Sequence, residues 1–233
     1  MALTDEQREL IKLRIKEHTH PRYTTDILLD QDVILKDLVV YPDILRPEKT
    51  SALYFARFLF LNKDIYKDKE VIDMGCGCGI QGILMATYGA HHVLLSDIFQ
   101  TAVQNTIENI KNAGLESKTS VTQGDLFETI DSTADVIIFN HPFFPAEMDP
   151  DIPVTGAMCN DGELIHRFFD EAPRYLNEGG ILIMPFFDFA GEINNPEIQG
   201  MKHGYTVRKV HAIEIDDENI QKGGFLVYEL KKS

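Results

Sequence analysis

The stretch Val71-Ile72-Asp73-Met74-Gly75-Cys76-Gly77-Cys78-Gly79 decides the fold of this chain. A short apolar run ends in a carboxylate and enters a turn with glycine at every second position, and residues 80–88 then read as a helix. Glycine permits a sharp strand-to-helix turn and lets a ligand lie against bare backbone. The helix start offers unpaired N–H groups and a partial positive charge, which suit a carboxylate or a phosphate. We therefore predict that a nucleotide-like cofactor binds at this turn.

Around this turn, strands and helices alternate along the chain. Strands are predicted at 70–74, 92–97, 118–123, 134–139, 180–187, 204–212 and 223–230, and helices at 80–88, 99–113, 162–177 and 190–200. This alternation predicts an α/β fold with a doubly wound, mostly parallel seven-stranded sheet, helices on both faces and a ligand at the carboxyl ends of the strands. Because no convincing helix separates the last two strands, they should form an antiparallel hairpin at the C-terminal edge.

The N-terminal part is predicted to be an extension, residues 1–45, that packs on a core domain of residues 46–233. It should contain a strand at 32–40, and an apolar-rich helix at 48–62 should follow it. Residues 8–22 carry five Lys and Arg and two His. For this basic segment a solvated face is favoured over a binding patch.

The first helix is predicted from its capping residues. Thr4 can act as N-cap and Gln7 can complete a capping box, so residues 4–17 should open as a helix. The alternation of Ile11, Leu13 and Ile15 fits a strand equally well, and this alternative stays open.

Bulk composition limits the function classes. The chain has 233 residues and a net charge of −15, from 22 Lys and Arg against 37 Asp and Glu. Nucleic-acid binding depends on basic residues that neutralise phosphates, so duplex DNA and long RNA are disfavoured as partners without being excluded. No apolar run approaches membrane-spanning length. Three cysteines supply neither a disulfide framework nor a full zinc site, so no metal is predicted and a reducing cytoplasm is the expected location.

Three carboxylates fall at predicted strand ends. Asp73 ends an apolar strand and must find hydrogen-bond donors. Asp97 lies about twenty residues beyond the glycines, where a carboxylate can accept from both ribose hydroxyls, although it can also cap the helix that opens near Phe99. Asp125 can accept from an adenine amino group, or it is only a turn residue after Gly124.

The spacing Gly77-x-Gly79-x-x-Gly82 also satisfies the dinucleotide fingerprint, so a nicotinamide dehydrogenase is a competing hypothesis. A carboxylate at the position of Asp73 would repel a pyrophosphate. S-adenosylmethionine (SAM) has no phosphate and carries an ammonium and a sulfonium, which Asp73 would attract. SAM is therefore the predicted cofactor.

The fourth core strand delivers Asn140-His141-Pro142-Phe143 at its carboxyl end. The Asn140 side-chain oxygen and the His141 carbonyl can each accept one N–H of a planar NH2 group, and Phe143 can stack on its plane. Pro142 forces His141 into an extended conformation that holds this carbonyl in place. Catalysis would then consist of positioning and electrostatics. Alternatively, the segment is a strand-ending turn with core phenylalanines.

The chain resembles the class I SAM-dependent methyltransferases that methylate amino groups. The resemblance rests on four motifs: Asp73-x-Gly75-x-Gly77-x-Gly79, Asp97, Gly124-Asp125 and Asn140-x-Pro142-Phe143. Within these, the chain is most similar to the HemK-type glutamine-amide methyltransferases, and the N6-adenine and N2-guanine RNA or DNA methyltransferases are similar as well. Residues 45–50 resemble the segment before a helix that covers SAM. Residues 160–168 and 176–180 resemble the Asp-Gly helix and the Gly-Gly turn of the same family.

The resemblance implies a SAM-dependent N-methyltransferase that acts on a planar amide or amino nitrogen, foremost of a protein glutamine or a small molecule. Base methylation of RNA or DNA, and a non-catalytic SAM-fold partner subunit, remain alternatives. The cofactor-binding residues that it implies are Thr50, Asp73, Gly75, Cys76, Gly77, Gly79, Asp97, Ile98, Asp125, Leu126 and Asn140. The catalytic residues that it implies are Asn140, His141, Pro142 and Phe143.

The chain departs from the family pattern in two places. His141 stands where the family has proline; its imidazole either takes up the proton lost after methylation or is an inert substitution, which is the favoured interpretation. The short extension is no separate docking bundle of the kind that release-factor methyltransferases use.

Cys76 and Cys78 are interpreted as space-filling residues. Residues 146–159 are long enough for a lid.

Overall fold

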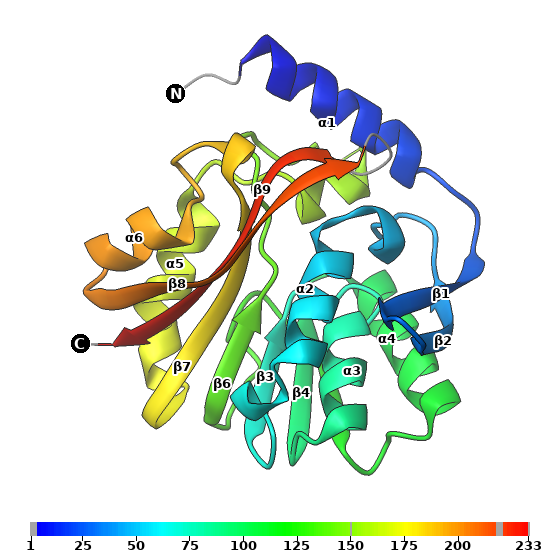
Figure 1. Ribbon diagram of the computed structural model, residues 1–233, viewed down its shortest axis with the longest axis vertical. Helices are drawn as coiled ribbons and strands as arrows, with labels where there is room; N and C mark the ends of the chain where they lie inside the picture. The colour runs from blue at the N-terminus through cyan, green and yellow to red at the C-terminus, as the bar shows by residue number, and fades with distance from the viewer. Residues whose placement is uncertain (1–3, 150, 218–220, 233) are drawn as a thin grey trace.

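The computed structural model describes residues 4–149, 151–217 and 221–232 of the chain. The main strands are β3 (Glu70–Met74), β4 (His92–Asp97), β5 (Thr119–Gln123), β6 (Ala134–Phe139), β7 (Leu176–Phe187), β8 (Tyr205–Asp217) and β9 (Gln221–Lys232). They form a seven-stranded sheet of order β5-β4-β3-β6-β7-β9-β8 (Figure 1). The first five are parallel and β9 runs antiparallel to both of its neighbours. The predicted fold and its C-terminal hairpin are confirmed.

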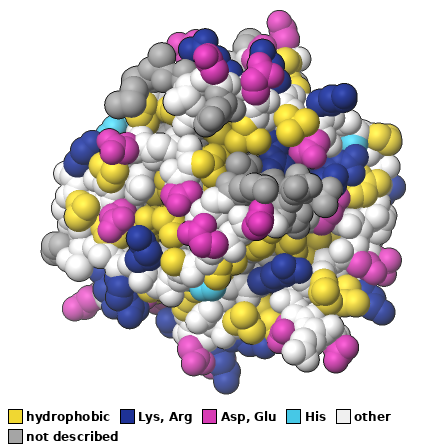
Figure 2. Space-filling model, turned by 45° about the horizontal axis from the view of Figure 1, so that its top comes forward, with side chains coloured by type: hydrophobic (Ala, Val, Ile, Leu, Met, Phe, Trp, Pro, Cys, Tyr) yellow, Lys and Arg dark blue, Asp and Glu magenta, His cyan; other side chains and the backbone are white. Residues whose placement is uncertain are grey.

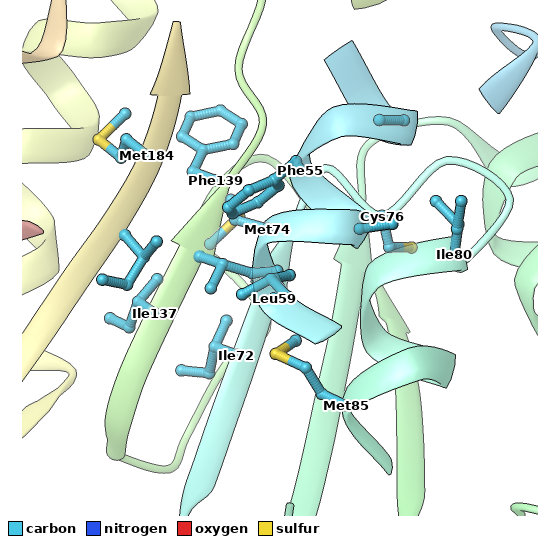
Figure 3. Close-up of a cluster of buried hydrophobic side chains, with 14 of the residues drawn as sticks. Phe55, Leu59, Ile72, Met74, Cys76, Ile80, Met85, Ile137, Phe139 and Met184 are labelled. Carbon is cyan, nitrogen blue, oxygen red and sulfur yellow. The ribbon is translucent and has the colours of Figure 1, made fainter. Parts of the chain in front are cut away.

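Helices cover both faces of this sheet (Figure 1). The helices are α2 (Ser51–Leu61), α3 (Ile80–Tyr88), α4 (Gln100–Ala113), α5 (Glu163–Glu171) and α6 (Pro196–Lys202). The first three pack on one face and the last two on the other. Figure 3 shows the core between α2, α3 and the sheet, where Phe55 and Leu59 of α2 face Ile72 and Ile137. Since β3 and β6 are covered on both faces, each contains a continuous apolar run, Val71-Ile72 and Val136–Phe139, rather than an alternating pattern.

Several element boundaries differ from the prediction; β8, for example, extends to Asp217 rather than to 212. Helix α5 ends at Glu171 rather than at 177 because Pro173 follows in a short 3-10 turn, and β7 begins at Leu176 rather than at 180. Helix α6 begins at Pro196 rather than at 190, since the Asn195 side chain accepts the backbone N–H groups that open the helix there.

The N-terminal residues form helix α1 (Asp5–His18) and a separate hairpin of β1 (Tyr23–Asp30) and β2 (Val33–Val40). The helix carries the predicted capping box of Thr4 and Gln7, so the strand alternative for this segment is wrong. Strand β1 was not predicted. The hairpin docks on α4, where Asn109 accepts from the Val39 N–H at 2.9 Å and donates to the Val39 carbonyl at 2.7 Å. Helix α1 lies across the carboxyl ends of the sheet strands (Figure 1).

In the described part of the chain, none of the helices has the length and hydrophobicity of a membrane-spanning segment.

Candidate active site

The glycine turn after β3 has left-handed backbone at every second residue. Gly75, Gly77 and Gly79 have φ of 66°, 58° and 83°, a region that side chains with a Cβ rarely adopt. The two cysteines between them are buried. Burial raises the pKa of both thiols, so they are held protonated, in agreement with their interpretation as space-filling residues. The sequence pattern thus has a direct conformational cause.

Asp73 lies beneath this turn and is 2% exposed. Its Oδ2 accepts the backbone N–H of Gly82 at 2.9 Å, which ties the end of β3 to the first turn of α3. Burial raises the pKa of Asp73 to about 7. A Cβ at Gly82 would overlap the Leu95 side chain of β4, so this third glycine of the dinucleotide-like spacing is explained by close helix–sheet packing.

Asp97 ends β4 and connects two strand ends. Its Oδ2 accepts the N–H of Gly77 at 2.9 Å, and its Oδ1 accepts the N–H of Phe99 at 3.0 Å. The second bond is a local turn and is not the helix cap considered from the sequence, because α4 has Phe99 as its N-cap residue and no side-chain cap. The bond to Gly77 was not predicted. Burial raises the pKa of this carboxyl group, while the two N–H donors act in the opposite direction. Each oxygen keeps a lone pair for a further donor.

Asp125 and Leu126 follow β5. The Asp125 carboxylate pairs with the Arg167 guanidinium of α5 at 2.7 Å, and both side chains are more than a third exposed. Leu126 is buried and has a φ of 51°, an uncommon conformation for a residue with a γ-branched side chain. Such backbone is held by its surroundings, and it often marks a ligand site.

A large cavity of about 460 Å³ opens at the carboxyl ends of β3, β4, β5 and β6, within the size range of small-molecule and cofactor sites. Ten of the predicted site residues line it: Thr50, Gly75, Cys76, Gly77, Asp97, Ile98, Asp125, Leu126, Asn140 and Pro142. Asp73 and Gly79 do not line it and support the turn from behind. Bare glycine backbone, five acidic side chains and apolar walls suit a nucleoside that carries a positive charge and no phosphate.

Four described residues between 146 and 159 form part of the wall of this large cavity. Met148, Gly156, Ala157 and Cys159 line it, and the sequence did not identify them as site residues. The segment packs so closely that a Cβ at Gly156 would lie 2.7 Å from the Phe99 ring and 2.8 Å from the Met148 sulfur. The loop therefore lies against the start of α4.

Asn140 lies between the large cavity and a small cavity of about 70 Å³, and it lines both. Its Oδ1 accepts from the Ser51 hydroxyl of α2 at 2.9 Å, a bond that fixes the orientation of the amide. The small cavity has aromatic and basic walls: Phe143, Phe144, Phe187, Phe189, Arg14, His18 and Lys49. Of these residues, the sequence identified only Phe143 as a site residue. The interpretation of residues 8–22 as a solvated face is wrong for Arg14 and His18.

The His141 ring is fully enclosed beside Phe139, Phe143 and Phe186. Its Nε2 donates to the Asn194 carbonyl at 2.8 Å, and burial lowers the pKa of the imidazole to about 4. The ring is therefore neutral and occupied as a donor, which fits the inert interpretation better than a proton acceptor. Asn194, which the sequence did not single out, also donates to the Phe143 carbonyl at 3.2 Å.

The fold and the large cavity define an α/β protein of the SAM-dependent methyltransferase class. Residues 55–192 match the model of the methyltransferase small domain family, and the chain belongs to that family. It is 32% identical to a protein of Methanocaldococcus jannaschii that is provisionally named a protein N5-glutamine methyltransferase, over 73% of this chain and 87% of that one.

One further relative and one solved structure of the same fold are named for ribosomal RNA. Ribosomal RNA small subunit methyltransferase C of Alcanivorax borkumensis is 29% identical over 65% of this chain, and the match spans only 42% of that protein. Among solved structures, the 16S rRNA N2 G1207 methyltransferase of Thermus thermophilus, in complex with AdoMet and guanosine, has a TM-score of 0.63 at 16% identity, over 91% of this chain and 50% of that one.

These findings settle the class of reaction and the cofactor. The chain is an enzyme that uses SAM as methyl donor. They support neither the nicotinamide dehydrogenase nor the non-catalytic partner subunit.

Proposed function

We propose that this enzyme methylates the nitrogen of a planar carboxamide, most of all the side-chain amide of a glutamine in a protein or peptide. The observation that carries the proposal is the position of Asn140 between the large and the small cavity, with its oxygen oriented by Ser51. A group held in the small cavity would meet a ligand of the large cavity at this residue.

On the cofactor side, Asp97 would accept from the ribose hydroxyls, and Asp125 and the Leu126 backbone would bind the adenine. Gly75, Cys76 and Gly77 would contact the methionine part, with Thr50 and Ile98 closing the cavity around it. Asp73 would act from behind the turn, through Gly82. When bound, SAM supplies an electrophilic methyl group on its sulfonium.

On the acceptor side, the Asn140 Oδ1 and the His141 carbonyl would accept the two N–H bonds of the amide. This arrangement turns the nitrogen lone pair out of the conjugated plane and toward the large cavity. Phe143 would lie against the plane of the amide, and Pro142 would keep the His141 carbonyl in place. The rate enhancement would come from orientation and from oxygens aimed at the positive charge that develops on nitrogen.

Size and charge favour a carboxamide over a nucleobase. The small cavity of about 70 Å³ matches a carboxamide better than a purine. The chain has a net charge of −15, and Figure 2 shows acidic and basic side chains interspersed around hydrophobic ones, with no continuous basic surface on this face. The relative with the more extensive match is the one named for glutamine methylation.

The test is transfer of labelled methyl from SAM by the wild-type enzyme to three acceptor classes in parallel. These are glutamine-containing peptides, the matched peptides with glutamate in place of glutamine, and RNA oligonucleotides. We expect label only on the glutamine peptides, with the methyl group on the amide nitrogen by mass spectrometry. If the RNA is labelled and the peptides are not, the proposal is wrong and the enzyme methylates a nucleobase.

A further inference from the structure

His18, the last residue of α1, is a buried polar residue of the small cavity for which the proposed function has no role. The residue is 0% exposed, and it lines the small cavity together with Asn140. Its Nε2 has no hydrogen-bond partner among the described residues. A buried polar atom without a partner is destabilising, so an atom of this kind beside a cavity points to a ligand.

The hydrogen bonds of His18 determine its tautomer. Its Nδ1 accepts the backbone N–H of Arg46 at 2.9 Å, so Nδ1 carries a lone pair and no proton. A neutral imidazole with this arrangement has its proton on Nε2. Burial and the nearby charges of Arg14, Arg46 and Lys49 lower the pKa of His18 to about 3, which keeps the ring neutral. The unpartnered atom is therefore a hydrogen-bond donor.

The position of this donor is fixed by the contacts of α1. Arg46 donates from its Nε to the Glu17 carbonyl at 2.8 Å, and Arg14 donates to the Lys49 carbonyl at 3.3 Å. The end of α1 is thus bound to residues 46–49, which lie beside Thr50 and Ser51 at the start of α2. These two residues line the small cavity as well.

We propose that His18 is the specificity-determining residue for the acceptor, and that its Nε2–H donates to the carbonyl oxygen of the substrate amide. This inference rests on the proposed function and extends it. The Asn140 Oδ1 and the His141 carbonyl are acceptors for the amide NH2 group, and neither of these two oxygens can bind the amide oxygen. His18 adds a neutral donor for that oxygen, so the small cavity matches a complete carboxamide, while a glutamate carboxylate would lack the N–H bonds that the two acceptors need.

Two substitutions distinguish the donor at Nε2 from the Nδ1 atom that accepts the Arg46 N–H. In His18→Asn the side-chain oxygen can replace Nδ1 as acceptor for Arg46, while the donor at the Nε2 position is lost. In His18→Gln a donor is restored near the Nε2 position, while the acceptor for Arg46 is lost. The assay is transfer of labelled methyl to a glutamine-containing peptide, with thermal unfolding and SAM titration for each variant.

We expect His18→Asn to lower kcat/KM for the peptide by about tenfold to a hundredfold, mainly through KM, with unchanged SAM affinity. His18→Gln should recover most of this loss. A His18→Asn variant that folds, binds SAM and methylates the peptide as well as the wild type would overturn the inference and leave the proposed function intact. A wild-type enzyme that methylates only RNA would overturn both.

A measurement on the unmodified enzyme covers the case in which neither variant folds. Nitrogen-15 NMR of the histidine rings, with the demethylated product of SAM bound, reports the His18 tautomer and the environment of Nε2. The proton should reside on Nε2, and addition of the glutamine peptide should shift that resonance, whereas the matched glutamate peptide should not. A proton on Nδ1, or a resonance that the glutamine peptide leaves unmoved, would contradict the role of His18.

Discussion

The two cavities that meet at Asn140 are built in different ways. The large cavity is built around the turns that follow β3, β4 and β5, which supply the glycine backbone, Asp97 and Asp125 from short motifs in chain order. Residues 43–52, the end of β6 and residues 159–167 complete its walls. The small cavity collects side chains from α1, the start of α2, the end of β6 and the end of β7. The first construction serves any acceptor, because the cofactor is shared by the whole enzyme class. The second construction determines what is methylated.

The cavities also differ in how their polar groups are satisfied. In the large cavity, the Asp97 carboxylate is bonded to two backbone N–H groups within the turns themselves. In the small cavity, His18 is held at one nitrogen and has no partner at the other among the described residues. A site organised by its own backbone should tolerate changes in the acceptor, whereas an incompletely paired site should respond strongly to the identity of its ligand.

The largest effect is expected at Asn140, the residue that lines both cavities, where methyl transfer and SAM binding should respond differently. Asn140→Ala should reduce methyl transfer by about 10²- to 10³-fold, since it removes an oxygen aimed at the reacting nitrogen. SAM affinity, measured by calorimetric titration, should stay within about threefold of the wild type, because the backbone of the glycine turn is untouched.

Ser51→Ala is the matched control, since it leaves the Asn140 side chain in place and removes only the hydroxyl that orients it. About a tenfold loss of transfer is expected from this variant. Equal loss of SAM binding in Asn140→Ala would show that Asn140 belongs to cofactor binding instead.

The same contrast explains what the sequence could and could not predict. Glycines at every second position and carboxylates at strand ends are local patterns with a direct backbone cause, so the sequence alone predicts site residues there: Asp73, Gly75, Cys76, Gly77, Gly79, Asp97 and Asp125. By contrast, Arg14, His18 and Phe189 reach the site only through the packing of α1 and the end of β7. No local pattern records such long-range packing, and the polar composition of residues 8–22 favoured a solvated face.

The next effect is expected at Asp73, the buried residue behind the glycine turn, and concerns the pH dependence of the free energy of unfolding. Folding raises the pKa of Asp73 from 3.8 to about 7, so the folded protein binds this proton more tightly than the unfolded chain does. The associated stability is fully present below about pH 4 and is lost as the pH rises through 7. Asp73→Asn does not titrate, and its side-chain oxygen can still accept from Gly82.

In urea unfolding, the free energy of unfolding of Asp73→Asn relative to the wild type should therefore increase by about 2 kcal/mol between about pH 5 and about pH 8. Taking the difference between the two proteins cancels the titration of all other groups. A difference that stays flat or decreases over this range would contradict the raised pKa.

A moderate effect on the cofactor alone is expected from Asp97. Asp97→Ala should weaken SAM binding by about tenfold to a hundredfold, because it removes the ribose acceptor and leaves the N–H groups of Gly77 and Phe99 without their partner. At saturating SAM, the KM for the glutamine peptide should be unchanged. Asp97→Asn keeps one acceptor oxygen, so its SAM affinity should lie between those of the wild type and Asp97→Ala. If the peptide KM rises as much as the SAM Kd, the two cavities are not independent.

The smallest effect is expected at the rim of the large cavity, from Arg167→Ala. The Arg167–Asp125 pair is short at 2.7 Å, but its side chains are 40% and 37% exposed, and pairs of this kind contribute about 0–1 kcal/mol. Its loss should change the free energy of unfolding by less than about 1 kcal/mol and the SAM affinity by less than about threefold. Raising the salt concentration should reduce even this difference. A tenfold loss of SAM affinity in low salt would instead mean that Arg167 orients Asp125 for the adenine, and that the large cavity depends on a residue outside its strand-end turns.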